Sequence, residues 1–332
     1  MFTLNVLSVS FLPSNNFKFM AFLWSHRNSP TIRRLSGSHK KKALAFLDQD
    51  PINSVLARGY VESMGMGQSH ALGILDSSKN VTALAWDGGN IIPLGFTPFE
   101  LEALSEDLLT RRRQASSLVG PQEQVLGLWN YLEPVWGNNL REVRPRQFCM
   151  SITHDKSQHG IQSVHAIPAG SLISNVEHMC TLVPPDPFLR LARPGEESTV
   201  GTASVAMFTE EVGYDPTKYG SMYLQRVANL IRLGLTFIRM GVDPATGNSR
   251  VDFKADIGAL SGGVAQLQGV WTHPDLRGQG IATGCLAAVV EYIHHNIAPT
   301  VSLYVNDYNT HAIAVYEAVG FSHHAMWATV LM

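Results

Sequence analysis

The stretch that most constrains the fold runs from an apolar segment through a glycine-rich turn into an amphipathic helix. The segment Leu267 to Trp271 precedes Arg277-Gly278-Gln279-Gly280, and apolar residues then recur every four positions from Ile281 to about His295. This spacing predicts a helix that packs one face against a sheet. The glycines allow a tight turn and leave unpaired N–H groups at the positive end of the helix. We therefore expect the turn to bind a phosphate or pyrophosphate.

The turn does not fit two common nucleotide-binding motifs. A P-loop ends in Gly-Lys-Ser/Thr, whereas Gly280 is followed by Ile281 and Ala282; the dinucleotide motif needs a third glycine where this chain has Thr283. The turn instead resembles motif A of the GNAT acyl-CoA N-acyltransferases, Gln/Arg-x-x-Gly-x-Gly/Ala, at Arg277, Gly280 and Ala282.

A second motif follows about thirty residues later in the sequence. Residues 300–306 alternate as a strand does, and Asn309 then begins a helix that Gly320 ends. Asn309-x-x-Ala312-x-x-x-Tyr316-x-x-x-Gly320-Phe321 resembles motif B of the same family. The two motifs together identify the region 265–321 as similar to a GNAT domain, with a fainter similarity from about residue 188.

The resemblance implies acetyl-CoA as cosubstrate and assigns residues to it. The backbone of Val270, Trp271 and Thr272 would pair with the pantetheine arm and help polarise the thioester carbonyl. The turn that follows would hold the pyrophosphate, through Arg277, Gly278, Gln279, Gly280, Ile281, Ala282 and Thr283. Asn309 matches a CoA-contacting asparagine, and Tyr316 matches the tyrosine that protonates the CoA thiolate. The alternative for Tyr316 is a core aromatic on the buried face of its helix.

The general base is harder to assign. Many family members carry a glutamate on the strand before motif A, but this chain has Gln266 and Gln268, which cannot accept a proton. We name Glu210 and Glu211, near the end of a helix that borders the acceptor pocket in the family, as candidates. Further candidates are Asp256 and His273, and a chain of water molecules is the remaining alternative.

The first half of the chain is expected to have the same order of elements as the GNAT fold. We predict a helix over 43–64, strands over 71–75, 81–86 and 90–95, a helix over 98–112, a strand over 116–119, a helix over 122–136 and a strand over 146–152. The turn before the second of these helices reads Gly95-Phe96-Thr97-Pro98, without the arginine and small residues of motif A, and Glu100, Glu102 and Glu106 follow. Carboxylates at a helix N-terminus repel an anion. We therefore predict a degenerate domain that binds no CoA.

The fold class expected is α/β, an α+β mixed sheet, with two GNAT-like domains in tandem and the intact CoA motif in the second; this layout is similar to that of mycothiol synthases. Residues 1–42 hold seven Lys/Arg and no acid, and we expect a disordered or extraneous extension, with a transit peptide as the alternative. The degenerate domain spans 43–152, a linker 153–187 and the catalytic domain 188–332. In the latter we predict strands over 188–192, 236–240 and 250–259 and helices over 198–212 and 221–233.

Composition limits the partners. With 332 residues, 45% of them hydrophobic, and a net charge of −2, the chain has no general attraction to nucleic acid or anionic membranes. Three widely spaced cysteines suit a reducing cytoplasm, and neither histidine pair has metal-chelating spacing. Arg111, Arg112 and Arg113 either grip a phosphate or complement a helix C-terminus.

The resemblance to the GNAT family implies an N-acetyltransferase, and we expect it to be cytoplasmic, a monomer or homodimer, and without a metal. It would transfer an acetyl group from acetyl-CoA to a primary amine of a small molecule or peptide. The alternative is an acyl-CoA-binding regulatory protein with little or no turnover, which the missing strand glutamate favours. The acceptor and the acyl-chain preference stay open.

Overall fold

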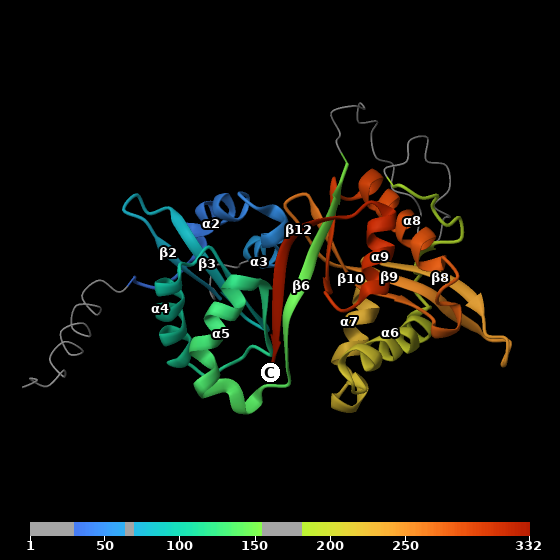
Figure 1. Cartoon of the computed structure of the whole chain (residues 1–332), viewed down its shortest axis with the longest axis horizontal. Helices are drawn as coiled ribbons and strands as arrows, with labels where there is room; N and C mark the ends of the chain where they lie inside the picture. The colour runs from blue at the N-terminus through green and yellow to red at the C-terminus, as the bar shows by residue number, and fades with distance from the viewer. Residues whose placement is uncertain (1–29, 64–69, 155–180) are drawn as a thin grey trace, which may run out of the picture.

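The computed structural model describes residues 30–63, 70–154 and 181–332, which form one mixed sheet with helices on both faces (Figure 1). Within this part of the chain the sheet has twelve strands in the order β1-β2-β3-β4-β5-β12-β6-β11-β10-β9-β8-β7. Strand pairs are antiparallel except for β4 with β5 and β10 with β11, which are parallel. A helix connects the strands of each parallel pair, as such a connection requires.

The first half contributes β1 (Arg33–Arg34), η1 (Gly37–His39), α2 (Lys40–Leu47), α3 (Pro51–Glu62), β2 (Ala71–Leu75), β3 (Val81–Asp87), β4 (Asn90–Leu94), α4 (Pro98–Leu109), β5 (Ser117–Pro121), α5 (Gln122–Trp136), η2 (Gly137–Asn139) and β6 (Glu142–Thr153). The strands and the later helices agree with the expected ranges to within a few residues. The prediction of a single helix over 43–64 is wrong, because residues 48–50 interrupt the helix and separate α2 from α3. Asp50 caps α3 by accepting the N–H of Asn53, and Pro51 is the first residue of α3. A proline favours the start of a helix because its missing N–H is not needed there.

The expected extension also ends earlier than residue 42. Residues 1–29 lie outside the described residues, but β1, η1 and the start of α2 are part of the fold. Arg33 and Arg34 pair with Gly73 and Leu72, and the side chain of Leu35 is fully buried. The chain therefore contributes to the sheet and its core from residue 33 onward.

The second half contributes β7 (Arg190–Leu191), α6 (Glu197–Val212), η4 (Pro216–Tyr219), α7 (Met222–Arg232), β8 (Thr236–Val242), β9 (Ser249–Ser261), β10 (Val264–Thr272), η5 (Pro274–Leu276), α8 (Ile281–Asn296), β11 (Thr300–Asn306), α9 (Thr310–Val319) and β12 (Ser322–Leu331). Most of the expected linker, residues 155–180, lies outside the described residues. The first expected strand, over 188–192, is shortened to two residues. The other expected elements are present, including the hairpin turn in which Gly247 donates to the carbonyl of Asp243.

Each half of the sheet is covered by helices on both faces. In the first half, α4 and α5 pack on one face around Ile91 and Leu118, and α2 and α3 pack on the other around Ile92. In the second half, α8 and α9 share a core with Phe237, and α6 and α7 share one with Ile238. Successive strand residues point to opposite faces of the sheet. Ile91 and Ile92 therefore pack into two different cores, and so do Phe237 and Ile238. The two halves thus have the same layering.

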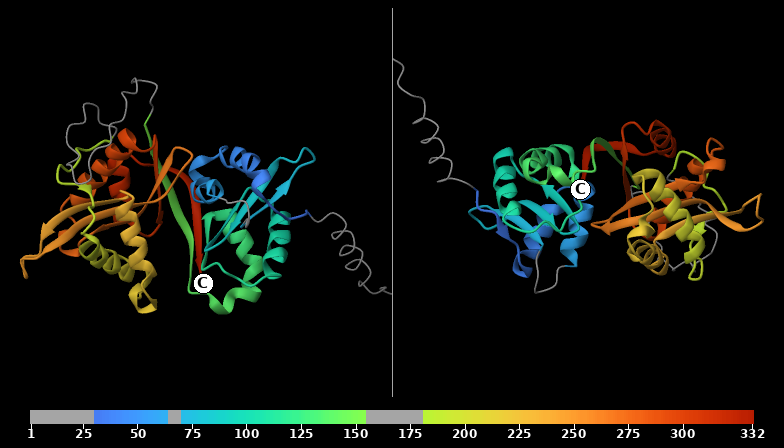
Figure 2. Two further views of the ribbon diagram at one scale, coloured as in Figure 1. Left: turned by 180° about the vertical axis from the view of Figure 1, so that it is seen from behind. Right: turned by 90° about the horizontal axis from the view of Figure 1, so that it is seen from below.

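The last strand of each half lies in the ladder of the other half. Strand β6 pairs with β11 on one side and with β12 on the other, and β12 also pairs with β5. Figure 1 and Figure 2 show β6 and β12 running side by side between the two halves. We assigned no element after residue 321 from the sequence and therefore did not predict β12 or this exchange. The halves are therefore joined by a continuous hydrogen-bonded sheet as well as by the linker.

Strand β12 also carries core residues of the first half. Trp327 is fully buried in the core beneath α2 and α3, and its indole N–H donates to Asn53 Oδ1 of α3 at 2.6 Å. Ala328 and Val330 of the same strand lie in the opposite core, with α4 and α5. A C-terminal residue thus stabilises the N-terminal half.

Trp327→Ala should therefore destabilise the first half of the chain by about 3–5 kcal/mol, because it removes a large buried side chain and leaves a cavity. Chemical denaturation followed by far-UV circular dichroism measures the loss. Tyr308→Ala, at a tyrosine that is 68% exposed, is the control and should change stability little. An equally small effect of both substitutions would contradict the role given to Trp327.

Candidate functional site

The glycine turn before α8 has the conformation that the sequence predicts. Gly278 and Gly280 have φ values of 72° and 77°, in the left-handed region that favours glycine. Gly280 is the N-cap of α8, and no side chain caps this helix end. A Cβ atom added to either glycine would meet nothing within 4 Å. The turn is exposed, so an anion has open access to its backbone.

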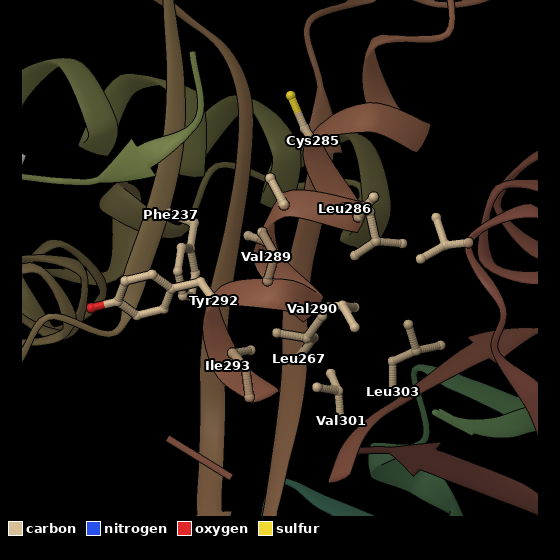
Figure 3. Packing of buried hydrophobic residues seen from close by; sticks show 14 of the residues in the cluster. Phe237, Leu267, Cys285, Leu286, Val289, Val290, Tyr292, Ile293, Val301 and Leu303 are labelled. Atoms are coloured by element: carbon tan, nitrogen blue, oxygen red, sulfur yellow. The ribbon is translucent and has the colours of Figure 1, made fainter. Parts of the chain in front are cut away.

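The helix behind the turn is held firmly. Ten residues of α8, from Cys285 to His294, are buried, and Figure 3 shows several of them packed against Phe237, Leu267 and Leu303 of the sheet. The first N–H groups of a helix have no intrahelical partner, and the first turn of α8 contains no acidic residue. The positive end of the helix therefore presents donors and a favourable potential to an anion.

The equivalent helix of the first half begins differently. Thr97 caps α4 by accepting the N–H of Glu100, and Glu100 Oε2 accepts the N–H of Thr97 at 2.7 Å. The N–H of Phe96 donates to Gln124 Oε1, and Pro98 has no N–H to offer. This capping box uses the donors that an anion would need and adds a carboxylate at the helix start. The N-terminus of α4 is thus capped by side chains, whereas the N-terminus of α8 is not.

Strands β10 and β11 separate next to the open turn. Their parallel ladder has three pairs of residues and ends with Gln266 opposite Ser302. Strand β10 continues to Thr272 against β9, and β11 continues to Asn306 against β6. The segment Val270–Thr272 therefore has no ladder partner on its β11 side, and its backbone groups there are available to a ligand.

A β-bulge shapes the same segment of β10. Gln268 lies opposite Asp256 and Trp271 lies opposite Lys254, so Gly269 and Val270 together face the single residue between them on β9. Gly269 has a φ of 58°, which a residue with a side chain rarely adopts. The bulge redirects the backbone at the point where β10 leaves β11.

Arg277 and Glu210 form an ion pair beside the turn. Arg277 Nη1 and Nη2 donate to the two oxygens of Glu210 at 2.6 and 2.7 Å, and Arg277 Nε donates to the carbonyl of Thr272 at 3.1 Å. Trp271 Nε1 also donates to Glu210, at 3.2 Å. The hydrogen bonds from Arg277 hold the pKa of Glu210 below its usual value. Glu210 is therefore a weak proton acceptor, and Arg277 is already engaged.

Glu211 is paired with the first half of the chain. Arg144 of β6 donates to Glu211 Oε1 at 3.0 Å and to its carbonyl at 3.2 Å. Arg144 is only 8% exposed and also contacts Glu142. The structure thus separates the two adjacent glutamates: Glu210 binds the arginine of the turn, and Glu211 binds a buried arginine where the two halves meet.

The other candidate bases have partners as well. Asp256 accepts from Lys254 Nζ at 2.7 Å and from Thr236 Oγ1 at 2.8 Å. His273 Nδ1 is 3.4 Å from the N–H of Asp275. Gln268 accepts from Arg226 of α7. Strand β10, which the structure describes in full, carries no carboxylate. The expected bases lie on other elements, and each has a partner.

Tyr316 and Asn309 lie on α9, as expected from motif B. Tyr316 is 8% exposed in the core shared with α8, and burial raises the pKa of its hydroxyl well above the ordinary value. The hydroxyl is therefore protonated at neutral pH. Asn309 is the N-cap of α9, where its side-chain oxygen accepts the N–H of Ala312. Its capping role is thus clear, and its contact with CoA stays a prediction.

The remaining residues assigned to the turn differ in burial. Gln279 is exposed and donates to the carbonyl of Asp275, whereas Ile281 and Ala282 are half-buried and pack against the main core. Thr283 is half-buried on the first turn of α8. Ile281 and Ala282 thus anchor the start of α8 in the core.

The arginine run of the first half complements a helix end. Arg111 forms ion pairs with Asp87 and Asp107 and donates to the carbonyl of Asp107, while Arg113 donates to the carbonyl of Ala115. A shallow pocket of about 210 Å³ lies nearby, lined by Arg34, His70, Asp87, Arg111, Arg112 and Gln114. The contacts of Arg111 favour the helix-terminus interpretation over a phosphate grip.

Two features of the site were missed in the sequence. Gly269 interrupts a strand pattern, which indicates a bulge, and Lys254 lies between Asp252 and Asp256 on one face of an alternating strand. Lys254 is fully buried. The alternation places these charges on one face of β9, but only the packing shows that the face is covered.

Comparison with known proteins defines the class of the second half. Residues 241–321 match the model of the "Acetyltransferase (GNAT) family", and residues 70–170 match "Domain of unknown function (DUF4081)". The comparison with curated proteins gives no match. The second half of the chain therefore contains a GNAT acetyltransferase domain.

Solved structures are similar in fold. A GCN5-related N-acetyltransferase from Sphaerobacter thermophilus has a TM-score of 0.55 at 15% identity, over 91% of this chain and 95% of that chain. A Drosophila protein solved by X-ray crystallography has a TM-score of 0.57 at 14% identity, over 91% and 99% of the two chains. The mixed α/β sheet is therefore a GNAT fold, and the similarity extends over both halves.

No described group of three or more His, Cys, Asp or Glu side chains is placed to hold a metal ion. Among the described helices, none is both long and apolar enough to span a bilayer.

The ion pair between Arg277 and Glu210 predicts how a charge change alters CoA binding. Glu210→Gln removes a carboxylate beside the anion site and frees the guanidinium, so affinity for CoA should rise by about two- to fivefold at low salt. Calorimetric titration with CoA measures the change. Glu211→Gln, which breaks the pair with Arg144 instead, should leave affinity unaltered. Weaker binding by Glu210→Gln would contradict this account of the turn.

Proposed function

We propose that the protein is an acetyl-CoA-dependent N-acetyltransferase whose acceptor is a primary amine of a small molecule or peptide. The observation that carries the proposal is the uncapped, exposed N-terminus of α8 beside the separated strand β10, within a GNAT acetyltransferase domain. The open helix end supplies N–H donors for a pyrophosphate, and the unpaired edge of β10 supplies backbone groups for the pantetheine arm.

Acetyl transfer needs a polarised thioester, a neutral amine and a proton for the departing thiolate. The backbone from Val270 to Thr272 meets the first need, and the protonated Tyr316 meets the last. Glu210 and Glu211 are engaged in ion pairs. We therefore propose that water, rather than a side chain of β10, carries the proton away from the amine.

The first half of the chain is assigned a different role. Its capped helix α4 leaves no open anion site, and its strand β6 is built into the sheet beside β11. Arg144 of β6 reaches the end of α6 through Glu211. We propose one CoA site per chain, with the first half a degenerate GNAT-like domain that shapes the acceptor side.

A second candidate is an acyl-CoA-binding regulatory protein with little turnover. Gln266 and Gln268 favour it, because neither can act as a base on the strand where a carboxylate is expected. The two candidates share the binding site and differ in the release of CoA.

A screen of amine acceptors with detection of free CoA tests the proposal. Acetyl-CoA should bind with one site per chain, and at least one class among amino acids, aminoglycosides, cysteinyl thiols and peptide N-termini should release CoA. Gly280→Glu should abolish binding, because it places a carboxylate at the helix start. Gly247→Glu is the matched control, since Gly247 also has a left-handed φ, 72°, and open surroundings. Tight binding without turnover on any acceptor would favour the regulatory candidate.

Tyr316→Phe tests proton donation separately. The ring and its packing remain, and only the hydroxyl is lost, so turnover should fall by about 10²–10⁴ with little change in acetyl-CoA affinity. Tyr292→Phe is the control, because Tyr292 on α8 is equally buried in the same core. Steady-state kinetics with an accepted amine measures both. If Tyr316→Phe behaves like Tyr292→Phe, Tyr316 is a core aromatic.

A further inference from the structure

Strand β9 contains a charged pair in the interior of the second half. The side chain of Lys254 is fully buried, and its ammonium donates to Asp256 Oδ2 at 2.7 Å. Asp256 Oδ1 accepts from Thr236 Oγ1 at 2.8 Å. A buried ion pair contributes little net stability, because the loss of hydration offsets the attraction between the charges. Apolar side chains of similar size would fill the same space at least as well, so stability alone does not account for the pair.

The pair lies against the bulge of β10. Lys254 Nζ also donates to the carbonyl of Gly269, at 3.3 Å. A Cβ atom on Gly269 would lie 3.1 Å from Lys254 Nζ and 3.2 Å from Asp256 Oδ2. Glycine at this position therefore allows the backbone of the bulge to approach the ion pair closely.

The other end of the same peptide unit points away from the pair. The carbonyl of Gly269 and the N–H of Val270 belong to one planar trans peptide, so they point in opposite directions. Gly269 and Val270 have no register partners in β9, and the ladder with β11 has already ended at Gln266. The N–H of Val270 is thus directed away from Lys254. Val270 belongs to the segment of β10 that the proposed function assigns to the thioester.

We propose that Lys254 and Asp256 are positioning residues for acetyl transfer. By holding the carbonyl of Gly269, the ammonium fixes and polarises the peptide that it shares with Val270, whose N–H donates to the thioester carbonyl of acetyl-CoA. This inference rests on the proposed function. Asp256 orients the ammonium through its hydrogen bond at 2.7 Å.

The chemical step shows what the polarised peptide does. The amine nitrogen attacks the thioester carbon, and the electrons of the carbonyl double bond move to its oxygen, which the N–H of Val270 stabilises. When the double bond forms again, the carbon–sulfur bond breaks, the thiolate takes up a proton, and the nitrogen releases one. The products are an N-acetylated acceptor and free CoA. A donor fixed in place before the reaction lowers the energy of the charged intermediate, because no reorganisation is needed as the charge develops.

The test uses the full chain and acetyl-CoA labelled with carbon-13 at the thioester carbonyl. Isotope-edited infrared spectroscopy measures the carbonyl stretch of the bound ligand, and no acceptor is required. On binding to the wild-type protein, the stretch should move to lower frequency than in water. Lys254→Met combined with Asp256→Leu removes both charges together, so that no lone charge stays buried. This variant should bind acetyl-CoA within about threefold of the wild-type affinity by calorimetry and lose most of the frequency shift.

Two further variants make the result decisive. Arg190→Met with Glu196→Gln removes another ion pair of the same half, between β7 and the start of α6, and should keep the full shift. If the apolar double variant does not fold, Lys254→Met with Asp256→Asn removes the charges and keeps an acceptor for Thr236; it should lose the same shift.

Each outcome has a defined meaning. An unchanged shift in a folded variant that binds acetyl-CoA would overturn the role of the pair and leave the proposed function intact. Failure of the wild-type protein to bind acetyl-CoA would overturn both. An equal loss of shift in the Arg190 and Glu196 variant would show a general structural effect and also overturn the inference.

Discussion

The hydrogen-bonded ladder between β6 and β12 is the constraint on which the rest of the structure depends. Each strand ends one half of the chain and lies within the sheet of the other, so neither half can complete its sheet alone. A strand edge left unpaired would expose a row of backbone donors and acceptors. The exchange satisfies both edges at once and fixes how the halves are placed. Trp327 of β12 also holds the two halves together, because its fully buried side chain lies in the core of the first half.

Within this frame, two helices in equivalent places begin with different chemistry. The capping box of Thr97 and Glu100 satisfies the N–H of Glu100 and places a carboxylate at the start of α4, whereas the start of α8 at Gly280 has no side-chain cap. The difference lies in a few residues of local sequence. In the proposed function it decides which half binds the anion, because the donors at a helix N-terminus are satisfied either by capping groups or by a ligand. The separation of β10 from β11 places an unpaired strand edge beside the open end.

The charges around the site are mostly paired with one another. Glu210 engages Arg277, Glu211 engages Arg144, and Asp256 engages Lys254. The hydrogen bonds from Arg277 lower the pKa of Glu210 and so weaken it as a base. In the proposed function, backbone N–H groups and the buried hydroxyl of Tyr316 carry the remaining chemistry, which suits a reaction that depends chiefly on positioning and on stabilising a developing charge.

Local sequence by itself determined the glycine turn, the closed start of α4 and the bounds of most elements, because turns, caps and alternating patterns depend on near neighbours. It also gave the two motifs of the GNAT domain. Only the tertiary structure decided the exchange of β6 and β12, the partners of Glu210 and Glu211, and the burial of Lys254 against Gly269. These contacts join residues far apart in the chain, and sequence periodicity shows which face a residue lies on, but not what covers that face.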